Sequence, residues 1–492
     1  MTYNVNVSDK EDSKVVFSRY LEGQFSEHLG TGIYGGLWVG KDSDIPNTRG
    51  IRDDVVTALA NLKVPVLRWP GGFFADNYHW REGIGPYDQR RKIINSSWGG
   101  TIENNAFGTH EYFDLCSRLG TESYININFS SGTIKEMADW LEYMMAPQGS
   151  MADLRAKNGH PEPWQLHFLG IGNESWGGGG HMTPEFYSDR YKLWQSFVRQ
   201  YGEKPVFKIG VGPNIDDFHW TDTVMKNAYE FMDGLSLHHY GLTDIWENKG
   251  DAVDFEAKEW HSLLYSIRKM DYFITEHTKR MDRYDQQKRV KLIVDEWGDW
   301  LHAEKGTNPA FLRQQNTIRD AVMAATTLNI FAKHADRVLM ANIAQTVNVL
   351  QSMILTNGQQ MLLTPTYYVF DMYKHHQDAT VLSAYSDNGD PISYTISKKD
   401  GNYIISVCNT DLEQSHNLTI TFAHDLGTEK YARVLHSEEM NAHNTFDDPN
   451  KVMSRKFDGF QIDANHLGIN LDNKSIITIV VPFKEGGSHG TN

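Results

Sequence analysis

Two segments of the sequence each place a glutamate directly after a run of apolar residues. Residues 168–176 read Phe-Leu-Gly-Ile-Gly-Asn-Glu-Ser-Trp and present Asn173 and Glu174, and residues 291–297 read Lys-Leu-Ile-Val-Asp-Glu-Trp and present Glu296. A single glutamate at a strand end is usually solvated or paired with an arginine. Two carboxyl groups facing one another are what glycoside hydrolysis requires, because one protonates the departing oxygen and the other attacks the anomeric carbon or activates water. The pair predicts acid–base chemistry on a sugar.

The aromatic residues favour the same kind of ligand. The chain has 13 Trp, 23 Tyr and 23 Phe, 12% of its residues, and most are expected to fill the core. Several, however, stand beside Gly, His or Glu at the ends of apolar runs, as in residues 68–72, 238–240 and 296–297. Flat apolar faces interleaved with polar groups are suited to a neutral polyol.

Other chemistries have weaker support. The glycines at 177–180 are not followed by Lys-Ser/Thr, so a Walker-type phosphate loop is excluded. No His-Glu-x-x-His or Cys/His ligand spacing is present, so we expect no catalytic metal and no cofactor. A Gly-x-Ser-x-Gly elbow for a serine nucleophile is also missing. His238 is either a structural histidine or a hydrogen-bond partner of the substrate.

Eight short apolar runs that end in polar residues or in a turn are the elements that would position these side chains. They cover residues 23–27, 64–69, 123–129, 167–174, 206–212, 234–240, 291–297 and 337–345. Helical periodicity lies between them, at 52–62, 110–119, 134–145, 184–201 and 316–334. Alternating strands and helices predict an α/β fold, a (β/α)₈ TIM barrel with its site at the carboxyl ends of the strands. Glu174 and Glu296 would close strands four and seven, on opposite sides of the barrel mouth.

After about residue 380 the pattern changes to short alternating runs separated by turn residues. These runs, at 391–398, 402–408, 416–423, 430–436 and 474–483, predict a C-terminal antiparallel β-sandwich domain. Tyr3, Val5 and Val7 also alternate. A lone terminal strand needs a sheet to pair with, so we expect residues 1–17 to add a strand to the sandwich. The predicted domains are therefore a catalytic barrel at 18–378 and a sandwich at 379–492.

Charge and composition exclude several classes of partner. The 492 residues include 47 Lys+Arg and 63 Asp+Glu, a formal net charge of −16, which argues against nucleic acid and against an anionic membrane surface. No apolar run is long enough to span a bilayer. The N-terminus lacks the basic and apolar regions of a signal peptide, which predicts a cytoplasmic protein. Cys116 and Cys408 could form at most one disulfide.

The sequence resembles the α-L-arabinofuranosidases of glycoside hydrolase family 51 along essentially its whole length. The Asn-Glu pair alone would indicate only the wider group of retaining barrel glycosidases, whereas Gly-x-Phe-x-Glu-His-Leu-Gly and Ala-Gln-x-Val-Asn narrow the resemblance. The segments that carry it are residues 23–30, 67–72, 104–111, 172–174, 236–240, 295–297 and 344–348.

The resemblance implies retaining, exo-acting release of terminal α-L-arabinofuranosyl residues from arabinoxylan- or arabinan-derived oligosaccharides, without a metal. It implies that Glu174 is the general acid/base and Glu296 the nucleophile. Members of this family often form hexamers, which suggests a homo-oligomer. Matching positions for substrate binding are Glu27, Arg68, Asn173, His238, Tyr240 and Gln345, with Trp98 and Trp300 at the pocket wall and mouth.

One position departs from the family pattern. Many members have Asn after the paired glycines, where this chain has Phe73. A bulky ring there would alter the shape of the pocket and its substrate preference. This keeps open an alternative function on the same scaffold, an endo-β-1,4-glucanase or xylanase with an open groove. A non-catalytic carbohydrate-binding protein is the remaining alternative, and it would be expected to lack one of the two carboxylates.

Overall fold

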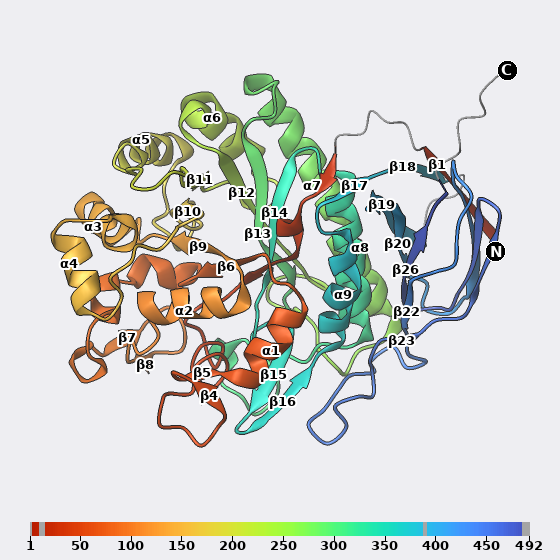
Figure 1. Ribbon diagram of the computed structural model, residues 1–492, viewed down its shortest axis with the longest axis horizontal. Helices are drawn as coiled ribbons and strands as arrows, with labels where there is room; N and C mark the ends of the chain where they lie inside the picture. The colour runs from red at the N-terminus through yellow and green to blue at the C-terminus, as the bar shows by residue number, and fades with distance from the viewer. Residues whose placement is uncertain (1, 9–14, 387–390, 485–492) are drawn as a thin grey trace.

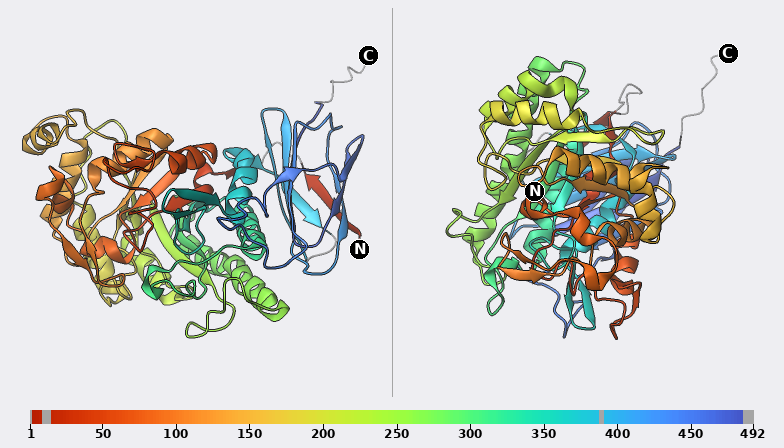
Figure 2. Two further views of the ribbon diagram at one scale, coloured as in Figure 1. Left: turned by 90° about the horizontal axis from the view of Figure 1, so that it is seen from below. Right: turned by 90° about the vertical axis from the view of Figure 1, so that its left-hand side faces the viewer.

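The computed structural model describes residues 2–8, 15–386 and 391–484. It consists of a closed barrel surrounded by helices and, on the right of Figure 1, a sandwich of two β-sheets. The predicted barrel and C-terminal sandwich are therefore confirmed. Figure 2 shows the two parts side by side, with α8 and α9 between them.

The barrel closes in the order β10-β11-β12-β13-β14-β3-β6-β9, and all eight pairings are parallel. Each of the eight predicted runs overlaps one barrel strand, to within two residues at the ends where a strand extends beyond its run. The strands are β3 (Gly23–Phe25), β6 (Val66–Trp69), β9 (Glu122–Asn126), β10 (Phe168–Ile171), β11 (Phe207–Gly210), β12 (Gly234–Gly241), β13 (Lys291–Asp299) and β14 (Val338–Ala344).

Helices cover the outside of the barrel. The predicted helical segments correspond to α1 (Asp53–Asn61), α2 (Thr109–Leu119), α3 (Ile134–Met145), α5 (Pro184–Gln195) and α8 (Ile318–Lys333). Several begin at a threonine whose hydroxyl accepts from a backbone N–H of the first turn, as Thr133, Thr183 and Thr317 do. Helix α5 ends six residues earlier than predicted. Phe197 beyond its end is 39% exposed, so continuing the helix would bury little apolar surface.

Further elements were not individually identified from the sequence. They are the helices α4 (Ser150–Lys157), α6 (Phe218–Ala228), α7 (Ala257–Tyr284) and α9 (Pro365–Tyr373), and the small hairpins β4 (Asn47–Thr48) with β5 (Ile51–Arg52), β7 (Ile93–Asn95) with β8 (Thr101–Glu103), and β15 (Ile354–Asn357) with β16 (Gln360–Leu363). A 3₁₀ turn, η2 (Phe73–Asn77), directly follows the Gly-Gly pair after β6.

The sandwich consists of a five-stranded and a seven-stranded sheet. The first has the order β18 (Ser383–Ser386), β1 (Thr2–Ser8), β21 (His416–Thr421), β25 (His466–Leu471), β24 (Phe460–Asp463). The second has the order β2 (Val16–Phe17), β17 (Ala379–Val381), β19 (Ile392–Lys399), β20 (Asn402–Asn409), β26 (Ser475–Pro482), β22 (Tyr431–Leu435), β23 (Arg455–Lys456). Apolar side chains from both sheets, Val5, Leu418 and Ile405 among them, share one core.

The N-terminal strand β1 lies inside the five-stranded sheet, where Figure 2 shows it in red among blue strands. It pairs antiparallel with β18 but parallel with β21, so this sheet is not purely antiparallel. Its alternate residues Tyr3, Val5 and Val7 are buried. The domain limits 1–17, 18–378 and 379–492 stay predictions, and residues 1, 9–14, 387–390 and 485–492 lie outside the described residues.

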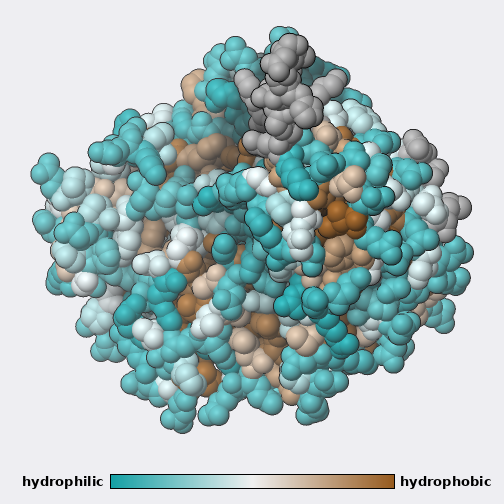
Figure 3. All heavy atoms as spheres, turned by 45° about the vertical axis from the view of Figure 1, so that its right-hand side comes forward, coloured by the Kyte–Doolittle hydropathy of each residue, from teal (hydrophilic) through white to brown (hydrophobic). Residues whose placement is uncertain are grey.

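The outer face of the seven-stranded sheet packs on α8 and α9 and joins the barrel core. Cys408 lies there against the Val322 carbonyl of α8, and both Cys408 and Cys116 are buried free thiols. Hydrophilic residues cover most of the face in Figure 3, with smaller apolar patches between them. Within the described part of the chain, none of the helices combines the length and apolar character needed to cross a membrane.

Candidate active site

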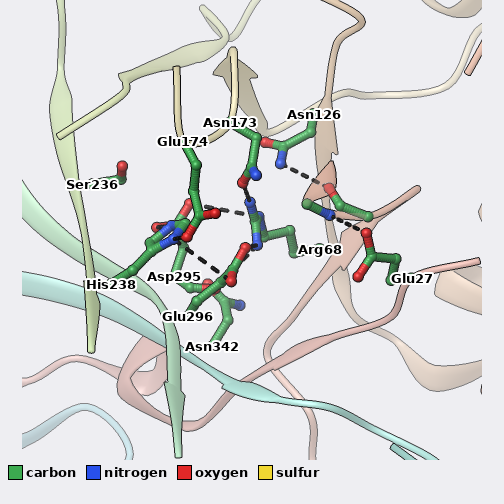
Figure 4. Close-up of polar contacts among 12 residues, drawn as sticks. Glu27, Arg68, Asn126, Asn173, Glu174, Ser236, His238, Asp295, Glu296 and Asn342 are labelled. Carbon is green, nitrogen blue, oxygen red and sulfur yellow. Dashed lines mark hydrogen bonds and ion pairs between the residues drawn. The ribbon is translucent and has the colours of Figure 1, made fainter. Parts of the chain in front are cut away.

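Glu296 lies near the carboxyl end of β13 and is held by two hydrogen-bond donors. Arg68, from β6, donates from Nη1 to Oε1 at 2.8 Å, and the Tyr240 hydroxyl, from β12, donates to Oε2 at 2.9 Å. The carboxylate is 9% exposed. Both oxygens are therefore fixed in orientation while the group still lines the pocket, and Figure 4 shows the Arg68 side chain beside Glu296.

Glu174 faces Glu296 from the end of β10. Its Oε1 lies 2.8 Å from Nδ1 of His238, and its backbone adopts a left-handed conformation with φ 41°. A carboxylate oxygen of Glu174, one of Glu296 and a ring nitrogen of His238 all lie within 4.8 Å of one another. The two carboxyl groups predicted from the sequence thus meet across a short gap.

Asn173 is oriented by the same arginine that holds Glu296. Arg68 donates from Nη2 to the Asn173 Oδ1 at 2.7 Å, which leaves the amide nitrogen free to donate elsewhere. A Cβ on Gly72 would stand 2.7 Å from Glu296 Oε1 and 3.2 Å from the Asn173 amide nitrogen. Only glycine at position 72 lets the loop after β6 approach these groups so closely.

Glu27 and Gln345 form a second polar group on the other side of Gly72. Glu27 accepts from the backbone N–H groups of Gly72 and Phe74 at 3.0 and 2.9 Å, and the Gln345 amide donates to its other oxygen at 3.2 Å. Burial raises the pKa of Glu27 to about 7, although the hydrogen bond from Phe74 N–H opposes this.

Aromatic rings form the walls of the pocket between these groups. The rings of Phe73 and Trp98 lie 6.0 Å apart, and those of Tyr240 and Trp300 lie 5.0 Å apart. Phe25, Leu29, Leu312 and Leu350 also line the pocket. The space between these walls is small, about 30 Å³.

Burial and neighbouring charges shift the pKa values of Glu174 and His238. Burial raises the pKa of Glu174, and the nearby charge of Glu296 raises it further, while the bond to His238 lowers it. Burial lowers the pKa of His238, but Glu296, Asp295 and Glu174 outweigh this effect and raise it to about 10. His238 is therefore an imidazolium at neutral pH, surrounded by carboxyl groups.

Glu174, His238 and Glu296 are also the described residues whose atoms come close enough to share a metal ion. An imidazolium has no lone pair for a metal, and the ring nitrogens of His238 already face Glu174 and Asp295. The donor set fits a hydrogen-bonded charge network better than a metal centre.

All eleven residues singled out in the sequence come together at this end of the barrel. Nine of them line the pocket, whereas Arg68 and His238 lie behind it and hold the carboxylates. The nine are Glu27, Phe73, Trp98, Asn173, Glu174, Tyr240, Glu296, Trp300 and Gln345.

Asp295 and Tyr124 also belong to the site, and sequence reasoning missed them. Asp295 accepts from the Tyr124 hydroxyl at 2.6 Å and lies 3.2 Å from Nε2 of His238. Strand alternation would place Asp295 and Glu296 on opposite faces, but the pairing of β13 with β12 shifts register between Ser236 and His238. This bulge brings both consecutive carboxylates into the network. The Asp-Glu pair itself was the only available signal.

A closed parallel barrel with a carboxyl pair at the ends of two of its strands, β10 and β13, defines the protein as a barrel glycoside hydrolase. Family models for an α-L-arabinofuranosidase 1 domain and an α-L-arabinofuranosidase C-terminal domain match residues 58–289 and 295–475. The chain belongs to the α-L-arabinofuranosidases of glycoside hydrolase family 51.

Individual relatives are similar over most of their length. An intracellular exo-α-L-arabinofuranosidase of Bacteroides ovatus is 46% identical over 95% of this chain and 94% of its own. The crystal structure of the GH51 arabinofuranosidase from Xanthomonas axonopodis pv. citri superposes with a TM-score of 0.95 at 42% identity, covering 98% of this chain and 99% of that one. A Paenibacillus polymyxa xyloglucanase of family 44, at 11% identity and a TM-score of 0.61 over 98% and 99% of the two chains, shares the fold alone.

Proposed function

We propose that the chain is a retaining, exo-acting α-L-arabinofuranosidase in which Glu296 is the nucleophile and Glu174 the general acid/base. The observation that carries the proposal is the gap between the two carboxyl groups, whose nearest oxygens are within 4.8 Å. Retaining glycosidases hold the groups about 5–5.5 Å apart, whereas inverting enzymes need about 6.5–9.5 Å to admit a water molecule.

In the first step the ionised Glu296 attacks the anomeric carbon while Glu174 gives its proton to the departing oxygen. The bond from the anomeric carbon to that oxygen breaks, and an arabinosyl ester on Glu296 forms. Arg68 and Tyr240 hold the nucleophile in position, because both donate hydrogen bonds to it. The raised pKa of Glu174 favours the protonated form that this step needs.

In the second step water hydrolyses the ester. Formation of the ester removes the charge of Glu296, which lowers the pKa of Glu174 and lets it act as the base that takes a proton from water. Water attacks the anomeric carbon, the ester bond breaks, and arabinose leaves with its original configuration. Both carboxyl groups return to their starting states.

The remaining polar groups are suited to bind sugar hydroxyls. The Asn173 amide nitrogen is free to donate, because its oxygen is occupied by Arg68, and we assign it to the 2-hydroxyl. That bond strengthens as the transition state acquires oxocarbenium character. Glu27 and Gln345, on the far side of Gly72, are suited to the other hydroxyls of the furanose ring.

The narrow pocket supports exo action over the endo-glucanase or xylanase alternative. Phe73, Trp98 and Trp300 wall a small pocket, whereas an endo-acting enzyme needs an open groove with several sugar sites. The presence of both carboxyl groups argues against a non-catalytic binding protein.

We further propose that the substrates are arabinoxylan- or arabinan-derived oligosaccharides. We propose that the protein acts in the cytoplasm, like the relative that is named intracellular. We also propose that it forms a homo-oligomer, which the family resemblance suggests is a hexamer.

A substrate panel tests the proposal. Purified protein should hydrolyse 4-nitrophenyl α-L-arabinofuranoside and should show little activity on the matching β-xyloside, β-glucoside, xylan and cellulose. ¹H NMR should show α-arabinose as the first product. Greater activity on unsubstituted polymers would favour the endo alternative, and β-arabinose as first product would exclude a retaining mechanism.

A further inference from the structure

A second hollow of about 490 Å³ adjoins the catalytic pocket, and the side chain of Phe73 lines both. Its other lining groups are mainly small and polar: Asp76, Asn77, Ser97, Ser130 and Ser131. They come from η2, from the loop after β7 and from the loop after β9. The Phe73 ring therefore lies between the catalytic pocket and this larger hollow, which is lined by three serines.

The hollow lies on the side of the general acid. Gly178, four residues after Glu174, lines it, and a Cβ there would stand 2.5 Å from the Phe73 ring. The Ser130 hydroxyl donates to the carbonyl of Gly179 at 2.5 Å, which ties the loop after Glu174 to the rim. The leaving group receives its proton from Glu174, so it must extend past this loop.

The lining has the chemistry of a site for a neutral sugar. The Asn77 amide donates to the Ser97 hydroxyl at 2.8 Å, so the two form a polar pair on the rim. Asp76 accepts from the N–H groups of Phe129 and Ser130, both at 3.0 Å, and fixes the opposite rim. Asp76 is the one formally charged residue in the lining. The described residues that line the hollow include no lysine or arginine to pair with an anionic sugar such as a uronate.

We propose that this hollow is the subsite for the leaving-group sugar, a neutral sugar of the oligosaccharide chain that stacks on Phe73 and hydrogen-bonds to Asn77 and Ser97. The inference rests on the proposed function, since it names the site of that reaction's leaving group. Phe73, the position that departs from the family pattern, then selects the leaving group and acts less on the arabinose itself. An aryl leaving group would stack on the Phe73 ring but would not depend on hydrogen bonds to Asn77 and Ser97.

The double variant Asn77→Ala/Ser97→Ala tests the subsite. The measured quantity is the ratio of kcat/KM on an arabinofuranosyl-substituted xylo-oligosaccharide to kcat/KM on 4-nitrophenyl α-L-arabinofuranoside. Loss of hydrogen bonds to the sugar alone should lower this ratio about tenfold. Transfer of arabinose from the aryl donor to methyl β-xyloside should fall with it, because an acceptor occupies the same subsite. Ser196→Ala, an exposed serine just beyond α5, is the matched control and should leave both quantities unchanged.

The outcomes separate the two proposals. An unchanged ratio and unchanged transfer in a variant that still hydrolyses the aryl arabinofuranoside would overturn the subsite and leave the proposed function intact. No hydrolysis of the aryl arabinofuranoside by the unmodified protein would overturn the proposed function and the subsite with it. Equal or better cleavage of a uronate-substituted oligosaccharide than of its neutral counterpart would also overturn the assignment to a neutral sugar.

Discussion

Arg68 connects Glu296 to Asn173: its guanidinium donates from Nη1 to the Glu296 carboxylate at 2.8 Å and from Nη2 to the Asn173 carbonyl oxygen at 2.7 Å. The proposed nucleophile on β13 and the amide at the end of β10 are therefore positioned by one side chain from β6. Burial lowers the pKa of Arg68, but Asp295 and Glu296 hold it above its ordinary value, so the cation persists.

Arg68→Lys tests whether activity needs only the positive charge of Arg68 or also the fixed geometry of its donors. A lysine retains the positive charge but cannot direct two fixed donors at Glu296 and Asn173 together. We expect kcat/KM on 4-nitrophenyl α-L-arabinofuranoside to fall about 100-fold, since small misplacements of reacting groups have effects of that size. Arg52→Lys is the control: Arg52 is buried and donates to Asp54 and to the Gly358 carbonyl, so its loss should lower the melting temperature and leave kcat/KM unchanged. An unchanged kcat/KM in Arg68→Lys would contradict the role of Arg68 in positioning Glu296 and Asn173.

Glu174→Ala should show a dependence on the leaving group. A poor leaving group needs protonation, so kcat/KM on an oligosaccharide should fall about 10²–10⁴-fold. An activated dinitrophenyl arabinofuranoside needs little protonation and should lose far less in the step that forms the ester. Glu296→Ala should abolish turnover of both substrates. Equal losses on the two substrates in Glu174→Ala would contradict the acid/base assignment.

His238→Asn should move the pH profile to the alkaline side. The charge and hydrogen bond of His238 lower the pKa of Glu174, so removing them leaves burial and Glu296 to raise it further. Glu174 acts as an acid only when protonated, and the alkaline limb of kcat/KM follows its pKa. The alkaline limb should therefore shift to higher pH when kcat/KM is measured from pH 4 to pH 10.

His239→Asn provides the matched control for that experiment. His239 is the next residue of β12, but its side chain points the other way, bonding to the Ser266 carbonyl and packing on Phe273 of α7. Burial lowers its pKa to about 4, so it is neutral at neutral pH. The alkaline limb should not move in this variant. An equal shift in both variants would show that the effect is not specific to His238.

Glu22→Gln should stabilise the protein at neutral and alkaline pH. Glu22 is 2% exposed, accepts from the Gln377 amide at 3.0 Å, and has a second oxygen with no hydrogen-bond partner among the described residues. Burial raises its pKa from 4.5 to about 8. Between these values the unfolded chain releases a proton that the folded chain keeps, so stability falls as pH rises from 4.5 to 8.

Glutamine has no such proton, so the gain in the free energy of unfolding should be near zero at pH 4.5 and roughly 1–3 kcal/mol at pH 8. Melting temperatures at the two pH values measure it. Glu203→Gln, at an exposed glutamate, should show no pH-dependent gain. A gain of equal size at both pH values would mean that burial of the ionised carboxylate is not the cause.

The order of the barrel strands could be predicted from the sequence because each strand is a short apolar run that ends in polar residues. The same pattern predicts the positions of Glu174 and Glu296, because each stands at the end of an apolar run and therefore at the end of a barrel strand. The small hairpins and α9 carry weaker local patterns, and they are held by contacts with the barrel. The parallel pairing of β1 with β21 joins residues more than 400 apart and has no local pattern.

The sequence by itself therefore determined the architecture, the two carboxyl groups and the aromatic residues around them. Only the tertiary structure decided how these groups are held. The register shift between β12 and β13 brings the side chains of both Asp295 and Glu296 into one network, Arg68 joins Glu296 to Asn173, and the Phe73 ring lies between the catalytic pocket and the neighbouring hollow. Each of these relationships depends on the register or packing of segments far apart in the chain, and spacing along the sequence carries no information about either.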